Sequence, residues 1–184
     1  MPASYKPMIV YRRLQRDELG RVREIDRTEA IDTLYVQEGA SLREVHGDFS
    51  ATPWDTVGSG EHSVAAQRAE LERYAGYGAI CIGAFDDDRL VGIGVVRFHV
   101  RPGVAQLAYL HVSHGSRGQG VGSALAAELE RLAREAGDTA MVVSATPSEN
   151  TVRYYLNRGF TPMAQPLPEL YELEPEDVHL EKRL

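Results

Sequence analysis

Three glycines alternate at the start of a long amphipathic segment, and an arginine precedes them. They lie in the stretch SRGQGVGS as Arg117, Gly118, Gly120 and Gly122. The first turn of a helix presents backbone N–H groups without helical partners, together with the positive end of the helix dipole. Glycines let an anion approach these groups closely and permit positive φ in the turn. The stretch therefore predicts a phosphate-binding site at a helix start, with Arg117 adding a full positive charge.

Two common phosphate-binding motifs do not fit this stretch. A P-loop requires a lysine after its last glycine, and the stretch contains none. A dinucleotide fingerprint requires a third glycine where Ser123 stands, and an acidic residue at the end of the following strand, whereas Asp138 precedes that strand. A glycine-rich tight turn without a ligand is the remaining alternative. The strand and helix predicted on either side favour the anion site.

Hydrophobic periodicity indicates the elements that position the glycines. An apolar strand is expected over 104–112, and a helix follows the glycines, with an apolar stripe that includes Val121, Leu125 and Leu129 and continues to Leu132 and Ala136. Gly137 suits the C′ position of that helix. A strand over 139–146 and a helix over 148–158 come next, which implies a parallel strand pair with a crossover. The other expected elements are strands at 7–15, 78–85, 90–100, 159–163 and 177–184, helices at 16–30 and 61–74, an irregular hairpin within 31–50, and an acidic loop at 167–177.

Two motifs together resemble one family. The first is R-x-x-G-x-G from Arg117 to Gly122, preceded by LAYLHV, and the second is Y-x-x-x-G-F from Tyr155 to Phe160. In this combination the chain resembles the Gcn5-related N-acetyltransferases, the GNAT family. The resemblance runs from about Gly78 to Phe160, and the first 77 residues match only in outline.

The resemblance implies a single α+β domain over 1–184, with a mixed, mostly antiparallel sheet, a splayed parallel strand pair and flanking helices. An acceptor-side half would cover about 1–77 and a coenzyme A-binding core about 78–160. Acetyl-CoA, the implied co-substrate, would lie between strands 105–113 and 139–146, its thioester carbonyl accepting a backbone N–H near the end of the first. The residues implied to contact it there are Val112, Ser113, Arg117, Gly118, Gln119, Gly120, Val121, Gly122 and Ser123.

Tyr155 occupies the family's tyrosine position, where it would donate a proton to the departing thiolate of coenzyme A. A phenol with a pKa of about 10 stays protonated at neutral pH and lies only ~1.5 units above a thiol. Tyr154 is the neighbouring competitor, and either ring could merely pack the helix. Many relatives carry an asparagine seven residues before the tyrosine, whereas this chain has Ser148 there and Asn150 two residues later. Ser148 is the natural N-cap of the helix, and a cofactor contact by either residue is the alternative.

The base that deprotonates the amine is less evident. Where the family often has a glutamate, this chain has Gln106. His111 on the same strand titrates in the right range, although a histidine on a central strand is more often a packed core residue. Further candidates are Asp26 and Glu29 on the expected N-terminal helix, His62 and His99. A water relay or a neutral substrate is also open. Cys81 is expected to be a small buried apolar group and not an acyl carrier.

Composition limits the remaining choices. The net charge of −7 argues against nucleic acid, no apolar run is long enough for a membrane span or a signal peptide, and a single cysteine excludes an internal disulfide and a cysteine-based metal site. We expect a cytoplasmic acyltransferase that acetylates a small-molecule or peptide amine without a metal, and a homodimer is possible. The Trp54 loop and the N-terminal half would line the acceptor site. A non-enzymatic acyl-CoA sensor, and a transferase using a longer acyl chain or a hydroxyl acceptor, stay open.

Overall fold

A computed structural model describes residues 8–184, which group into two compact units. The first unit contains the chain up to Arg27 and the segments Pro53–Val95 and Tyr109–Leu129. The second contains Thr28–Thr52, Val96–Ala108 and Glu130–Leu184. Each unit is therefore assembled from three separate segments of the chain, and each is described below by itself.

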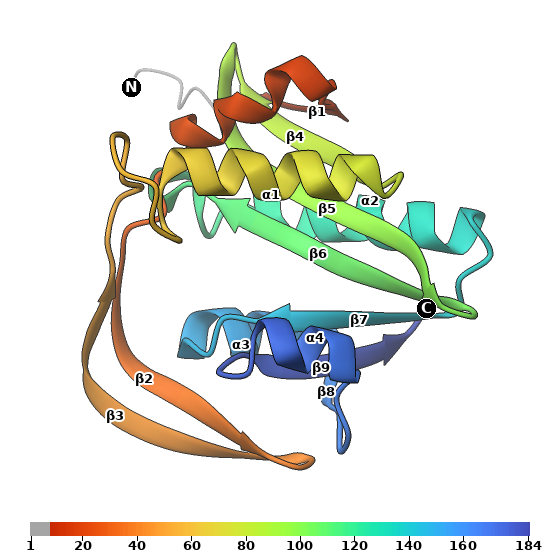
Figure 1. The fold of residues 1–184 in the computed structure, drawn as a ribbon. Coiled ribbons are helices and arrows are strands. Elements are labelled where there is room, and N and C mark those ends of the chain that lie inside the picture. The colour runs from red at the N-terminus through yellow and green to blue at the C-terminus, as the bar shows by residue number, and fades with distance from the viewer. Residues whose placement is uncertain (1–7) are drawn as a thin grey trace, which may run out of the picture. The chain divides into compact units, whose positions relative to one another are not determined.

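The strands of the first unit follow one another in the order β1-β4-β5-β6, drawn in red to green in Figure 1. Their bounds are Ile9–Arg13 for β1, Ile80–Asp86 for β4, Arg89–Arg101 for β5 and Val104–Val112 for β6, and β5 and β6 continue into the second unit. β1 pairs antiparallel with β4. The expected first strand is confirmed, although Pro7, where it was predicted to begin, lies outside the described residues.

Two helices of the first unit differ in type. The predicted N-terminal helix is a short 3-10 helix, η1 (Arg16–Glu24), so Asp26 lies in the connection after it and not on a helix. Helix α1 (Val64–Gly76) is an α-helix as predicted, and the Ser63 hydroxyl caps it by accepting from the Ala66 N–H at 3.1 Å. A further 3-10 turn, η2 (His114–Ser116), follows β6.

Helix α2 (Val121–Glu135) begins within the glycine-rich stretch, between Gly120 and Gly122. Its predicted apolar stripe is buried from Val121 to Leu129, but Ala133 continues it, whereas Ala136 is exposed. The helix lies close against β5, because a Cβ on Gly94 would come within 2.9 Å of the Leu129 side chain. Gly137 ends the helix with φ +93°, as predicted for the C′ position.

The second unit continues the strand order as β6-β7-β9-β8. β7 (Ala140–Ala145) runs parallel to β6 from Val104/Ala140 to Gln106/Val142 and antiparallel to β9 (Val178–Arg183), which also pairs with β8 (Thr161–Pro162). The parallel pairing covers only the first three residues of each strand. Helices α3 (Glu149–Asn157) and α4 (Pro168–Leu173) follow β7 and β8. The segment predicted to be an acidic loop therefore contains a helix, because Pro168 favours helix initiation at its first position.

A long antiparallel hairpin completes the second unit. Strands β2 (Glu29–Glu38) and β3 (Ser41–Ala51) are joined at Gly39, whose φ is +62°, and a register shift follows Ile31. Figure 1 shows the hairpin in orange as a curved pair of strands. The predicted hairpin is confirmed, but Glu29 belongs to its first strand and not to a helix. The fold class is also confirmed, since the sheets are mostly antiparallel with one parallel pair and flanking helices. No helix of residues 8–184 is long and apolar enough to span a membrane.

Candidate functional site

The glycine loop at the start of α2 has the backbone that an anion site requires. Gly118 and Gly120 have φ values of +71° and +86°, which residues other than glycine rarely adopt. A Cβ at either position would meet no heavy atom within 4 Å, so both glycines border open space. The first helical bond runs from the Ala124 N–H to the Gly120 carbonyl at 3.0 Å, so the amides before it lie at the positive end of the helix dipole. No acidic side chain occupies the first turn of α2. The loop therefore fits a diphosphate group.

Two long side chains of this loop donate hydrogen bonds to main-chain carbonyls around it. The Arg117 guanidinium donates to the Val112 carbonyl at 3.1 Å and to the Arg27 carbonyl at 3.4 Å, and it stays exposed. The Gln119 amide donates to the Gly115 carbonyl at 3.1 Å. Arg117 thus attaches the loop to the end of β6, and its positive charge at the rim of an anion site stays a prediction. Val112, Val121, Gly122 and Ser123 are in the same unit, and of these Val121 is buried.

Ser113 has a positioning role that the sequence did not reveal. Its N–H donates to the Val91 carbonyl at 2.8 Å, and its hydroxyl accepts the Asp26 N–H at 3.0 Å. The Asp26 carbonyl in turn accepts the His114 N–H at 2.8 Å. The Ser113 N–H is therefore already bonded within the chain, so a backbone N–H for the thioester carbonyl would come from another residue near this end of β6. Asp26 acts here through its main chain.

His111 lies among aromatic rings on β6. Its ring centroid is 4.7 Å from that of Tyr109 and 5.4 Å from that of Trp54. Burial, followed by the positive charges of Arg27 and Arg117, lowers the pKa of His111 to about 4. The imidazole is thus neutral at physiological pH, which a base requires, but it is also a weak base.

Arg27 and Trp54 were not identified as partners from the sequence. The Arg27 guanidinium lies 4.6 Å from the Trp54 ring centroid. Arg27 Nε and Nη1 and Trp54 Nε1 are buried without a hydrogen-bond partner among the described residues. Burial lowers the pKa of Arg27. Beside them, the Tyr109 hydroxyl bonds to Gln67 Oε1 at 2.5 Å. No local pattern in the sequence signals this cluster, because its members come from three segments.

Tyr155 belongs to the second unit and is buried at 4% exposure. Its ring makes edge contacts with Tyr154 and Phe160, at centroid distances of 5.1 and 5.4 Å. Burial raises the pKa of Tyr155 far above the ordinary value, and the neighbouring Tyr154 and Asp177 add to the increase. The pKa of Tyr154 is raised by burial to about 12. Tyr155 is consequently protonated throughout the physiological pH range.

Ser148 and Asn150 begin the helix that carries Tyr155. Ser148 is the N-cap residue, as predicted, but its hydroxyl donates to the Thr151 hydroxyl at 2.9 Å and makes no capping bond to the backbone. The Asn150 amide donates to Glu29 Oε1 at 2.7 Å. Glu29, a candidate base, is therefore bonded to the start of α3.

The two remaining candidate bases, His99 and His62, and two further residues singled out in the sequence, Gln106 and Cys81, are bonded to other groups, exposed or buried. Buried Gln106 accepts a hydrogen bond from Arg97 at 2.9 Å. His99 has φ +53° and its Nδ1 lies 2.8 Å from Asp138, while His62 is exposed. Cys81 is a buried free thiol, and burial raises its pKa to about 12, as suits an inert core group.

Comparison with known families decides the assignment. The profile described as Acetyltransferase (GNAT) family matches residues 42–160. The chain belongs to the GNAT family. It is accordingly an acyltransferase, and acetyl transfer is the reaction that the family supports. The match begins well before Gly78, where the resemblance in the sequence became specific, and includes most of β3 and all of α1. A comparison with curated protein sequences finds no match.

Solved structures show the same fold as this GNAT chain. Nourseothricin acetyltransferase is 19% identical, with a TM-score of 0.71 over 95% of this chain and 98% of its own. The PaiA N-acetyltransferase from Thermoplasma acidophilum, in complex with coenzyme A, is 15% identical, with a TM-score of 0.61 over 96% and 99%. A protein of Bacillus anthracis str. Ames assigned as a streptothricin acetyltransferase, in complex with acetyl coenzyme A, is 16% identical, with a TM-score of 0.62 over 97% of both chains. At these identities the likeness is one of fold.

Proposed function

We propose that this GNAT protein is an acetyl-CoA-dependent N-acetyltransferase whose acceptor is a primary amine. The observation that carries the proposal is the loop at Gly118 and Gly120, with positive φ and open space at the entrance of α2. The amides of residues 117–123 would hold the diphosphate of coenzyme A, and Ser148 and Asn150 remain candidates for further contacts. Acetyl-CoA would supply the activated acetyl group, and complexes of two structural relatives with coenzyme A or acetyl coenzyme A support that choice.

The chemistry asks for two proton transfers. The amine nitrogen forms a bond to the thioester carbonyl carbon, the C–S bond breaks, the nitrogen loses a proton and the thiolate gains one. We assign the second proton to the Tyr155 hydroxyl, because its raised pKa keeps it protonated. That raised pKa also increases the mismatch with an ordinary thiol. Burial raises the pKa of a thiol as well, as Cys81 illustrates. In a site without water, the difference in pKa between the Tyr155 hydroxyl and the thiol of coenzyme A would therefore be smaller.

The first proton has no single assigned acceptor. His111 is neutral at physiological pH, but the lowered pKa makes it a poor base for an ammonium group. We therefore favour a substrate that reaches the site as the free amine, with His111 as the residue to test for removal of the one proton that the nitrogen loses once the C–N bond has formed. The value of kcat/KM would then rise with pH up to the pKa of the amine, because the fraction of free amine rises over that range.

Two measurements test the proposal. Acetyl transfer is assayed by thiol release with a panel of primary amines that includes nourseothricin, because a structural relative carries that name. The Tyr155→Phe variant is then compared with Tyr154→Phe. We expect Tyr155→Phe to lower kcat by roughly 10²- to 10⁴-fold while coenzyme A binding by calorimetry is unchanged. Equal kcat in the two variants would remove Tyr155 from the mechanism, and binding of coenzyme A without transfer to any amine would favour a sensor.

A further inference from the structure

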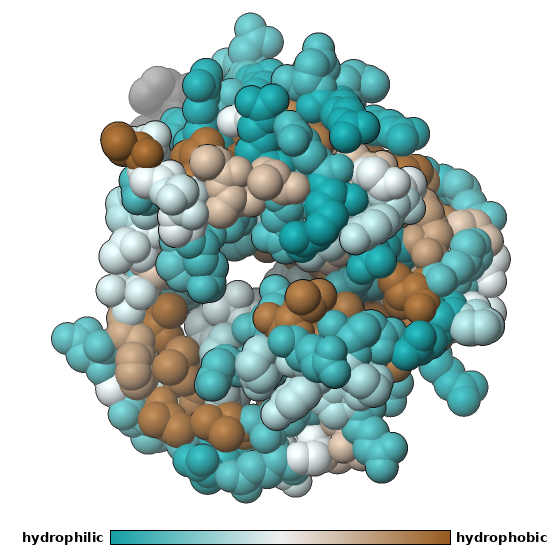
Figure 2. All heavy atoms as spheres, in the orientation of Figure 1, coloured by the Kyte–Doolittle hydropathy of each residue, from teal (hydrophilic) through white to brown (hydrophobic). Residues whose placement is uncertain are grey.

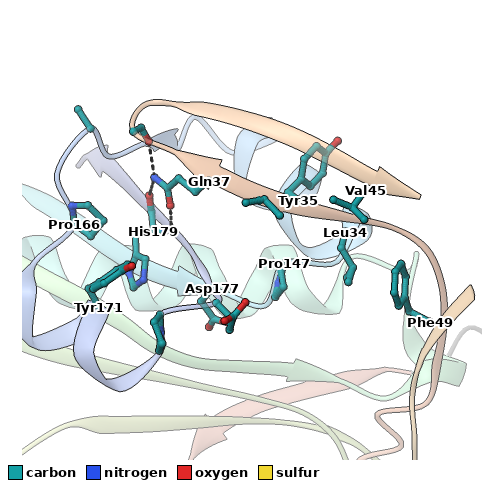
Figure 3. Close-up of a pocket in the computed structure, with 15 residues that line it drawn as sticks. Leu34, Tyr35, Gln37, Val45, Phe49, Pro147, Pro166, Tyr171, Asp177 and His179 are labelled. Carbon is teal, nitrogen blue, oxygen red and sulfur yellow. Dashed lines mark hydrogen bonds between the residues drawn. The ribbon is translucent and has the colours of Figure 1, made fainter. Parts of the chain in front are cut away.

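A pocket of about 420 Å³ lies within the second unit, and none of its described lining residues belongs to the glycine loop. The β2–β3 hairpin forms one side, and Pro147 together with the segment around α4 and the start of β9 forms the other (Figure 3). The volume is within the range of small-molecule sites. None of the chemistry described above uses this space.

Hydrogen bonds to the main chain fix the walls of the pocket. The Gln37 side chain donates to the Met163 carbonyl at 2.9 Å. It also donates to the His179 carbonyl at 3.2 Å, and its Oε1 accepts the His179 N–H at 2.7 Å (Figure 3). The Tyr35 N–H donates to the Pro147 carbonyl at 2.8 Å. The hairpin is therefore attached to β9 and to the turn before α3, and the pocket is preformed.

The lining combines apolar surface with negative charge. Aromatic, aliphatic and proline side chains form most of it, including Phe49, Pro147 and Tyr171, and Figure 2 shows apolar side chains gathered over the hairpin. Glu176 and Asp177 are its acidic residues, and no lysine or arginine occurs among the described lining residues. Burial lowers the pKa of His179, whose ring nitrogens lie 3.2 Å from the Ser144 hydroxyl and 3.0 Å from the Glu174 carbonyl, so it adds no positive charge at neutral pH.

The pocket adjoins the start of α3, the helix that carries Tyr155, within the same unit. Pro147 in its wall directly precedes Ser148, the N-cap of the helix that carries Tyr155. Leu34, a lining residue of β2, forms a β-bridge with Ser148, whereas Tyr155 itself is not among the residues that line the pocket. A molecule in the pocket therefore lies next to the start of the helix that carries the proposed proton donor.

We infer that this pocket binds the acceptor and selects an amine that carries a second, cationic amino group on an apolar stem. The inference rests on the proposed function. One amino group must be neutral to attack the thioester, so the carboxylates of Glu176 and Asp177 serve a different group, which stays charged. The stem lies against the apolar and aromatic wall, where a cation also gains from the faces of aromatic rings.

Three compounds of equal stem length test the inference: 1,6-diaminohexane, hexylamine and 6-aminohexanoate. Binding to the full chain is measured by calorimetry without acetyl-CoA, and acetyl transfer is measured separately. We expect kcat/KM for the diamine to exceed that for hexylamine at least 10-fold, because hexylamine has no second cation for the carboxylates when its only amino group attacks. We expect 6-aminohexanoate to be the poorest substrate. The double variant Glu176→Gln/Asp177→Asn should weaken diamine binding and lower its kcat/KM about 10-fold or more, and it should leave kcat/KM for hexylamine and the affinity for coenzyme A within twofold. Glu172→Gln, an exposed acid on α4 outside the pocket, is the matched control.

The outcomes separate the two proposals. Equal kcat/KM for the diamine and hexylamine, or an equal effect of Glu172→Gln, would overturn the inference. Diamine binding that the double variant abolishes, without acetyl transfer to any amine, would support the pocket and refute the proposed function. As a second variant, Ala164→Trp adds bulk at an exposed lining position, and it should abolish diamine binding while thermal unfolding shows an intact fold. Retained binding in that folded variant would also overturn the inference.

Discussion

Gly120→Ala separates the two properties of the glycine loop, its backbone conformation and its open space. Alanine at φ +86° costs about 1 kcal/mol of folding free energy, because the left-handed region disfavours a Cβ. The added methyl group meets no heavy atom of the chain within 4 Å, so no clash adds to that cost. It projects instead into the space proposed for the diphosphate. Displacing one charge-assisted hydrogen bond of ~1.5–3 kcal/mol weakens coenzyme A by roughly 10- to 150-fold.

Gly78→Ala is the control for this variant. Gly78 has φ +78°, a Cβ there also meets nothing within 4 Å, and the residue lies between α1 and β4, outside the loop. Both variants should lose similar stability in urea, and only Gly120→Ala should lose affinity for coenzyme A in calorimetry. If Gly120→Ala binds coenzyme A as tightly as Gly78→Ala does, the loop does not hold the diphosphate and the reasoning is refuted.

Three further predictions concern stability and reactivity. The pKa of His111 is lowered to about 4 in the folded state, so between pH 4 and 6.5 the unfolded chain binds one more proton than the folded chain. The free energy of unfolding therefore falls by about 3 kcal/mol as pH decreases through that range, and His111→Gln should lose this part of the pH dependence measured in urea. Glu130→Ala leaves Lys182 and Arg158, each bonded to it at 3.0 Å, without their buried carboxylate and should cost about 3–5 kcal/mol, against under about 1 kcal/mol for exposed Glu135→Ala; equal losses would contradict the burial argument. Cys81, with its pKa raised to about 12, should react with iodoacetamide at pH 8 roughly a thousandfold more slowly in the folded chain than in urea, and fast labelling of the native protein would exclude an inert core thiol.

Local patterns in the sequence predicted much of the fold and the loop of the candidate site. The apolar stripe from Val121 to Leu129 indicated α2, and Gly137 indicated its end, because these signals depend on residues close in the chain. The helix expected to carry Asp26 and Glu29 was wrong, since η1 ends at Glu24 and β2 begins at Glu29. Its continuous charged pattern does not distinguish a long helix from a short one followed by a strand.

Long-range contacts could not be predicted in the same way. The sequence indicated Ser113 only as a cofactor contact. In the structure its N–H donates to Val91 and its hydroxyl accepts from Asp26, and both partners are distant in the sequence. The pocket likewise depends on Gln37 bonding to the main chain of Met163 and His179. One sequence contains no information about such pairs, so the roles of these polar residues became visible only in three dimensions.

The interleaved composition of the two units has a consequence for engineering and for evolution. Because each unit draws on three stretches of chain, no single cut or truncation releases either one whole. Exchanging one continuous segment of the chain therefore does not replace a whole unit together with its substrate preference. That preference can change only through substitutions and loop insertions that leave β5, β6 and α2 uninterrupted, since those elements belong to both units.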